Sequence, residues 1–149
     1  MAELAATQSS NRHAHRFYAI LLPIPIVSFT GALLTDWAYQ YSGGNLQWAN
    51  FSSWLLATGL LFGAIAGIVL LIMLALDGTL RRTSAAAAHL GLLFVAWVIE
   101  LINALVHSRD GWTAVVPTGL TLSVIALVVA LASGWLWQSA RYRRAGVAP

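Results

Sequence analysis

The residues most able to do chemistry lie in the apolar segment from Ser84 to His107, which carries His89, Glu100, Asn103 and His107. At about 100° per residue, the two histidines and Glu100 fall on one line along a helix, with Asn103 about 40° away. The histidines are separated by about 27 Å along such a helix, close to the thickness of a hydrocarbon core. Because a lipid-facing stripe of ionisable groups is too costly, we expect it to point into protein.

Two histidines suggest a haem site at one end of this stripe. His15 precedes the first apolar segment and His89 lies in the first turns of the third, so both belong to the same membrane face. Since the first and third spans of such a chain run parallel, the two imidazoles could ligate one haem b iron axially. The alternatives are interfacial solvation for His15 and an interhelical hydrogen bond for His89.

Four polar residues predict a second site near the opposite face. Asp36 ends the first apolar segment at a level similar to that of Glu100, Asn103 and His107. Together they could form an outward-facing pocket for a quinone head group or a proton. The alternative is a hydrogen-bonded structural cluster that contains a protonated Glu100.

Composition excludes several other kinds of site. The chain has no cysteine, which rules out disulfides, thiolate catalysis, zinc–thiolate sites and iron–sulfur clusters. No set of nucleophile and base suggests catalytic residues, so we expect no stand-alone catalytic activity and no metal site. The net charge of +3 reflects membrane topology, and nucleic acid is not an expected partner.

The elements that must position these residues are membrane spans. Of the 149 residues, 59% are hydrophobic and only 9% are charged, whereas a soluble domain carries about a quarter charged residues. Four long apolar blocks follow one another, and a polar stretch over 40–53, containing Ser42-Gly43-Gly44-Asn45, is expected to be a loop. The predicted organisation is a polar tail over 1–16, a transmembrane domain over 17–139 and a basic tail over 140–149. Its four spans are expected at about 17–39, 54–76, 85–107 and 116–137.

The arginines give the orientation. Only Arg109 lies on one side of the predicted membrane, and the other seven lie on the opposite side: Arg12, Arg16, Arg81, Arg82, Arg141, Arg143 and Arg144. By the positive-inside rule, both termini are cytoplasmic. The predicted fold is an all-α integral membrane protein, a four-transmembrane-helix bundle of the bacterial inner membrane.

The second span contains Gly59, Gly63 and Gly67 at four-residue spacing. Small residues at this spacing let membrane helices approach closely. We expect them to pack inside the bundle, and a dimer interface is the alternative.

Several short motifs, in order, resemble one family of small bacterial membrane proteins. They are Pro23-Ile24-Pro25-Ile26 followed by Asp36, Trp48-Ala49, Asp77, His89, Ser133-Gly134-Trp135-Leu136 and the tail Arg141-Tyr142-Arg143-Arg144-Ala145-Gly146-Val147. Over about residues 18–147 the chain resembles the family called domain of unknown function twenty-two thirty-one. It departs from the family pattern at Tyr18-Ala19, where members usually have His-Pro. The resemblance implies four spans. The family domain also occurs fused to sugar-dehydrogenase-like or Rieske-like modules, which implies an association with redox proteins.

These observations favour a subunit or partner of a bacterial membrane redox system, linked to electron transfer, quinone or haem. Expected partners are the lipid bilayer and other membrane or periplasmic redox proteins, or a second copy of the chain. The alternative is a structural or assembly subunit of a membrane complex that holds no cofactor.

Overall fold

A computed structural model describes residues 13–77, 83–109 and 115–144. Over these residues the chain is helical apart from short turns, with α2 (Pro23–Tyr41), α3 (Leu46–Leu76), α5 (Ser84–His107) and α6 (Leu120–Arg144). A short π-helical turn, η1 (Val115–Gly119), precedes α6. Residues 13–21 are also helical and continue into α2. The described residues thus contain four helices long and apolar enough to cross a membrane, which confirms the predicted all-α fold.

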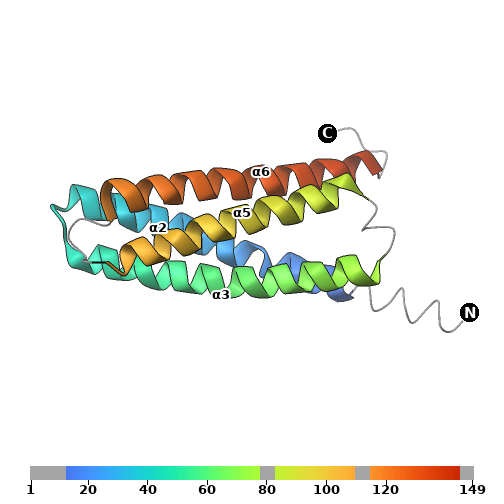
Figure 1. The fold of residues 1–149 in the computed structure, drawn as a ribbon, viewed down its shortest axis with the longest axis horizontal. Coiled ribbons are helices and arrows are strands. Elements are labelled where there is room, and N and C mark those ends of the chain that lie inside the picture. The colour runs from blue at the N-terminus through green and yellow to red at the C-terminus, as the bar shows by residue number, and fades with distance from the viewer. Residues whose placement is uncertain (1–12, 78–82, 110–114, 145–149) are drawn as a thin grey trace, which may run out of the picture.

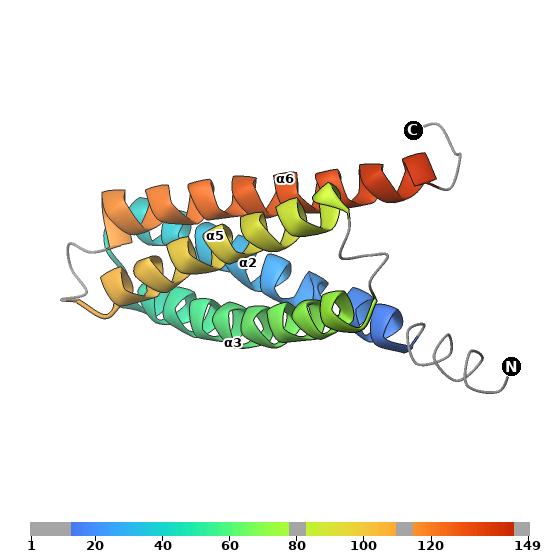
Figure 2. The same ribbon diagram turned by 45° about the vertical axis from the view of Figure 1, so that its right-hand side comes forward.

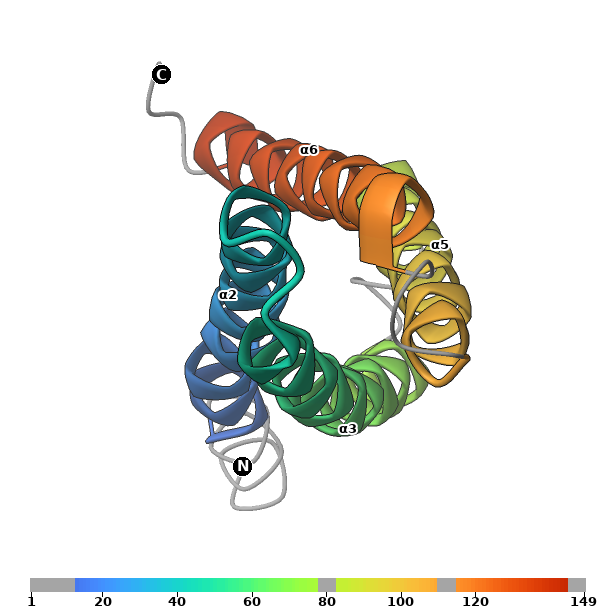
Figure 3. The ribbon, with the colours of Figure 1, turned by 90° about the vertical axis from the view of Figure 1, so that its left-hand side faces the viewer.

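The four helices lie side by side along the longest axis of the molecule (Figures 1 and 2). Helix α2 packs against α3 and α6, and α5 packs against the same two helices, so the arrangement is closed (Figure 3). Residues 13–21, the start of α5 and the end of α6 share one end, which we call the His89 end. The end of α5 and η1 lie at the opposite end, which we call the His107 end.

Helix α3 begins earlier than its sequence suggested, because most of the expected loop over 40–53 is helical. Asn45 caps its first turn by accepting a hydrogen bond from the backbone N–H of Gln47 at 3.0 Å. The turn before it contains Gly43 and Gly44, whose positive φ angles of 71° and 87° favour glycine. Ser52, expected in the loop, is instead fully buried between helices.

Most of the surface along the helices is apolar. Ile20, Trp54, Leu76 and Phe94 are each more than 60% exposed, with values of 69%, 75%, 69% and 63%. The buried side chains form separate clusters, including one around Leu70 and Trp137 at the His89 end. Such a large apolar surface on long helices requires a hydrocarbon environment, so the helices contact a lipid bilayer.

The row of glycines in α3 has two different environments. A Cβ atom at Gly59 would overlap the ring of Phe29, so α2 and α3 approach closely there. A Cβ at Gly63 would lie 3.1 Å from Cδ1 of Trp97 on α5. No atom lies within 4 Å of the corresponding position at Gly67. Close packing inside the bundle therefore holds at Gly59 and Gly63, whereas Gly67 faces open space.

Candidate functional site

Buried polar side chains from all four helices meet at the His107 end. Five of the six are fully buried and the side chain of His107 is 2% exposed. We call them the Asp36 cluster: Asp36 of α2, Ser52 of α3, Glu100, Asn103 and His107 of α5, and Ser123 of α6. The structure thus brings together the four residues that the sequence placed near this face and adds two serines.

Asp36 lies at the centre of this cluster. His107 Nε2 is 2.8 Å from Asp36 Oδ1, which also accepts a hydrogen bond from the hydroxyl of Ser52. The hydroxyl of Ser123 donates to Asp36 Oδ2 at 3.0 Å. Both carboxyl oxygens are therefore satisfied by protein groups, as a buried carboxylate requires.

The position of one His107 proton follows from its partners. Nδ1 lies 2.9 Å from the backbone carbonyl oxygen of Asn103, which can only accept, so Nδ1 carries a hydrogen. A second proton lies between Nε2 and Asp36, either on the imidazole or on the carboxyl group. In both arrangements the pair has no net charge, which suits its burial in a membrane-spanning bundle.

Asn103 connects this pair to Glu100. Its side-chain amide donates to Glu100 Oε2 at 3.0 Å and to the Ser123 hydroxyl at 2.8 Å. Because Ser123 uses its own hydrogen on Asp36, it must accept from Asn103, and this fixes the orientation of the amide. Glu100 is thereby joined to Asp36 through two intervening side chains.

Two oxygen atoms of the cluster have no hydrogen-bond partner within the described residues. They are Glu100 Oε1 and Asn103 Oδ1, both on fully buried side chains. An ionised Glu100 would place an uncompensated charge beside the neutral Asp36–His107 pair, at high cost inside a bilayer. A proton on Glu100 Oε1 removes that charge and makes the oxygen a donor. The arrangement is therefore suited to holding a proton on Glu100.

A glycine lets η1 close over the cluster. A Cβ atom at Gly119 would lie 2.7 Å from Cε1 of His107 and 3.2 Å from Asn103 Oδ1. No ordinary side chain fits there without displacing the imidazole, so the backbone of Gly119 packs directly on it. Sequence reasoning had given this glycine no role.

The second polar site surrounds His89, which is fully buried near the other end. The hydroxyl of Ser133 donates to the backbone oxygen of His89 at 3.0 Å, so Ser133 must accept from His89 Nδ1, 2.7 Å away. His89 Nε2 then accepts from the hydroxyl of Tyr18 at 2.7 Å. The indole of Trp137 stacks on the imidazole, with ring centres 5.0 Å apart. With these partners His89 is neutral, and it links the helical stretch 13–21, α5 and α6.

This environment does not fit a bis-histidine haem. Both ring nitrogens of His89 are engaged within the chain, so neither faces an iron. His15, the other predicted ligand, is half-buried in the helical stretch 13–21, and the ring partners of His89 are Tyr18 and Ser133 instead. Nor do the described residues contain a group of three or more His, Cys, Asp or Glu side chains that could hold a metal ion.

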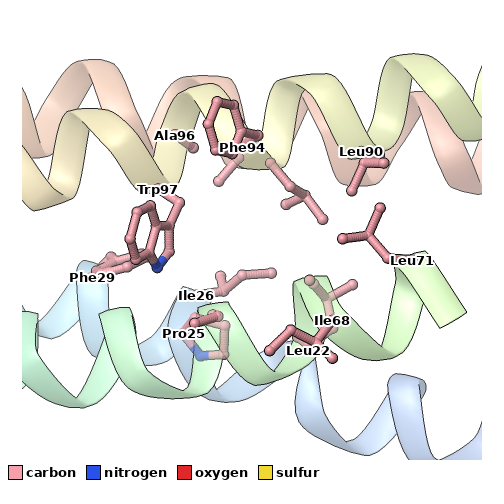
Figure 4. A pocket seen from close by; sticks show the side chains of 16 residues that line it. Leu22, Pro25, Ile26, Phe29, Ile68, Leu71, Leu90, Phe94, Ala96 and Trp97 are labelled. Atoms are coloured by element: carbon pink, nitrogen blue, oxygen red, sulfur yellow. The ribbon is translucent and has the colours of Figure 1, made fainter.

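A cavity of about 250 Å³ lies in a different place from the predicted quinone pocket. Its walls are mostly apolar side chains from the start of α2, the second half of α3 and the first part of α5, together with Ala130 of α6 (Figure 4). None of the four residues predicted for the outer pocket lines it. At the place where the sequence suggested a head-group pocket, the described residues form the hydrogen-bonded Asp36 cluster.

Four important partners were missed from the sequence: Tyr18, Ser52, Ser123 and Ser133. Hydroxyl residues are common in membrane helices, where many bond to their own backbone, as Thr30 does to Ile26. Their spacing within one helix shows which face they share, but not which histidine or carboxyl group the neighbouring helix presents. Only Tyr18 was singled out by its sequence, because it stands at a position where members of the family it resembles usually have histidine.

Of three comparisons with known proteins, the one with family models found a match, which agrees with the four apolar helices. A comparison with curated proteins and another with solved structures found no match. The family model described as "Predicted membrane protein (DUF2231)" matches residues 14–148, nearly the whole chain. The chain therefore belongs to this family of predicted membrane proteins.

Proposed function

We propose that the chain is a subunit or partner of a bacterial membrane redox system, in which the Asp36 cluster exchanges protons. The single observation that carries this proposal is the burial of two ionisable units in one hydrogen-bonded cluster. One is the Asp36–His107 pair and the other is Glu100, joined to it through Asn103 and Ser123. Ionisable side chains inside membrane spans are rare and commonly mark proton pathways.

The two units would act together. Asp36 and Glu100 are both carboxyl groups, so loss of a proton from one makes loss from the other more costly. His107 lowers this cost by carrying positive charge when Asp36 is ionised. Uptake or release of one proton changes the charge of the cluster by one unit, and this change can compensate the charge of an electron that arrives at or leaves a redox partner.

The place of this exchange follows from the proposed topology. With both termini in the cytoplasm of an inner-membrane protein, the His107 end lies near the periplasmic face. The partners we propose are therefore membrane or periplasmic redox proteins, with self-association as a further form of assembly. The fusions of the family domain to sugar-dehydrogenase-like or Rieske-like modules support this choice of partners.

Respiratory measurements test the proposal. Membranes from cells that lack the protein are compared after complementation with wild type, Glu100→Gln or Gly91→Ala. Gly91 is exposed and open to a Cβ, so its variant controls for expression and insertion. We expect Glu100→Gln to reach normal levels in the membrane yet reduce electron transfer from at least one respiratory donor. Equal oxygen uptake with every donor in all three strains would overturn the proposal.

A structural or assembly subunit without a cofactor is the second candidate. The closed hydrogen-bond network of His89 favours it, because no ring nitrogen there is left for a ligand. In that case Glu100→Gln leaves electron transfer unchanged, whereas removal of the protein lowers the amount of an assembled membrane complex.

A further inference from the structure

The apolar cavity has a clear position relative to the helices. On one side are Leu22, Pro25 and Phe29 of the first span, and on the other are Leu90 and Trp97 of α5. Residues 63–71 of α3 and Ala130 of α6 complete the wall, and the missing side chain of Gly67 leaves space there. In Figure 4, Phe29 and Trp97 lie at one end of this space and Leu71 and Leu90 at the other.

The cavity opens toward the surface of the bundle. Three of its lining residues, Ile68, Leu71 and Phe94, are 56%, 52% and 63% exposed. All three lie well inside segments that can span a membrane. The material at the opening is therefore the hydrocarbon interior of a bilayer, and the occupant must enter from there.

The walls also define what part of a molecule can bind. The lining side chains are hydrocarbon except for Trp97, whose indole N–H already donates to the backbone oxygen of Leu60 at 2.9 Å. A quinone head group would need a hydrogen-bond donor for its carbonyl oxygens, and this wall offers none. A hydrocarbon chain needs only contact, and its polar head can remain at the membrane surface.

We propose that this cavity binds one acyl chain of a membrane phospholipid, which packs between α3 and α5. Its volume of about 250 Å³ exceeds the roughly 150 Å³ of an engineered apolar cavity that holds benzene. The bound chain supplies dispersion contacts where Gly67 provides no side chain, and it thereby completes the interface between the two helices.

Two glycine variants form a matched test. Gly67→Leu places a side chain in the cavity, and no atom lies within 4 Å of its Cβ position. Gly91→Leu adds the same side chain on α5, also without a neighbour within 4 Å, but Gly91 does not line the cavity. Any general effect of replacing a helical glycine is therefore common to both variants.

The measurement is photolabelling of the full chain in phosphatidylethanolamine vesicles that contain a trace of phospholipid with a diazirine in mid-chain. We expect label on residues 63–71 and 90–97, reduced by about threefold or more in Gly67→Leu and unchanged in Gly91→Leu, because only the former removes the packing space. If Gly67→Leu gives no folded protein, the smaller Gly67→Val serves instead.

Two results would overturn the proposal. The first is equal labelling of both segments in wild type and in the folded Gly67 variant, which would mean that the label reports ordinary surface lipid. The second is displacement of the label from both segments by one equivalent of isoprenoid quinone, which would assign the cavity to a quinone tail.

Discussion

His107 Nε2 lies 2.8 Å from Asp36 Oδ1 and ties the last turn of α5 to α2. Both side chains are almost completely buried in a protein whose surface is mostly apolar. The contact therefore does two things at once: it joins non-consecutive helices, and it keeps a carboxyl group and an imidazole at zero net charge.

Removal of either partner should destabilise the protein strongly. We expect Asp36→Leu and His107→Leu each to lower the free energy of unfolding by about 3–5 kcal/mol, because each leaves one buried member of the pair without the other. The double variant should lose less than the sum of the two single variants. Thermal unfolding of the purified proteins in one detergent measures this coupling, and strictly additive losses would contradict the buried pair.

The contact between Gly119 and His107 gives a second prediction. Gly119→Ala forces a methyl group against the imidazole, so we expect a loss of about 1–3 kcal/mol from overpacking. Gly134→Ala on α6 is the matched control, since no atom lies within 4 Å of its Cβ position. The two thermal unfolding midpoints are compared, and an equal midpoint for both variants would argue against close packing of η1 on the cluster.

Tyr18 provides a prediction for the other polar site. Tyr18→Phe removes only the hydroxyl that donates to His89 Nε2 and leaves a buried acceptor unsatisfied. The expected cost is about 1–3 kcal/mol. Tyr41→Phe, at a position 78% exposed, should cost almost nothing and controls for the change of residue type. Equal unfolding midpoints for the two variants would show that the Tyr18 hydroxyl does not support His89.

The topology derived from the arginines is tested by reporter fusions. Fusions after Arg82 and after Pro149 should report a cytoplasmic location, and a fusion between Ser42 and Asn45 a periplasmic one, because Lys and Arg are retained on the cytoplasmic side. An active periplasmic reporter after Pro149 would contradict the proposed orientation.

The sequence predicted the helices well and the contacts between them only in part. The helical period of His89, Glu100 and His107 correctly indicated a stripe that faces protein, and all three are buried. The early start of α3 was missed because its first turns are polar on one side, although Ser52 there is buried. Periodicity within one helix does not specify the rotation of its neighbour, so the pairing of His89 with Tyr18 and Ser133 required the structure.

Glu100 gives the most discriminating prediction, since one of its oxygens accepts from Asn103 and the other has no partner among the described residues. Glu100→Gln retains an oxygen that can accept from Asn103 and adds an amide donor that can replace the O–H of a neutral carboxyl group, so we expect nearly unchanged stability. Glu100→Leu removes one of the two acceptors of the buried Asn103 amide and should cost about 1–3 kcal/mol. Thermal unfolding of both variants measures this difference.

Infrared spectroscopy then reports the proton itself. If Glu100 is held neutral in the bilayer, it contributes a carbonyl-stretching band of a protonated carboxylic acid at neutral pH, and Glu100→Gln lacks this contribution. Asp36→Asn is the control, because it removes the neighbouring carboxyl group and leaves Glu100 in place. An unchanged band in Glu100→Gln would assign the proton to Asp36, and Glu100 would then have to be ionised. That result would contradict a neutral Glu100, on which the proposed proton exchange depends.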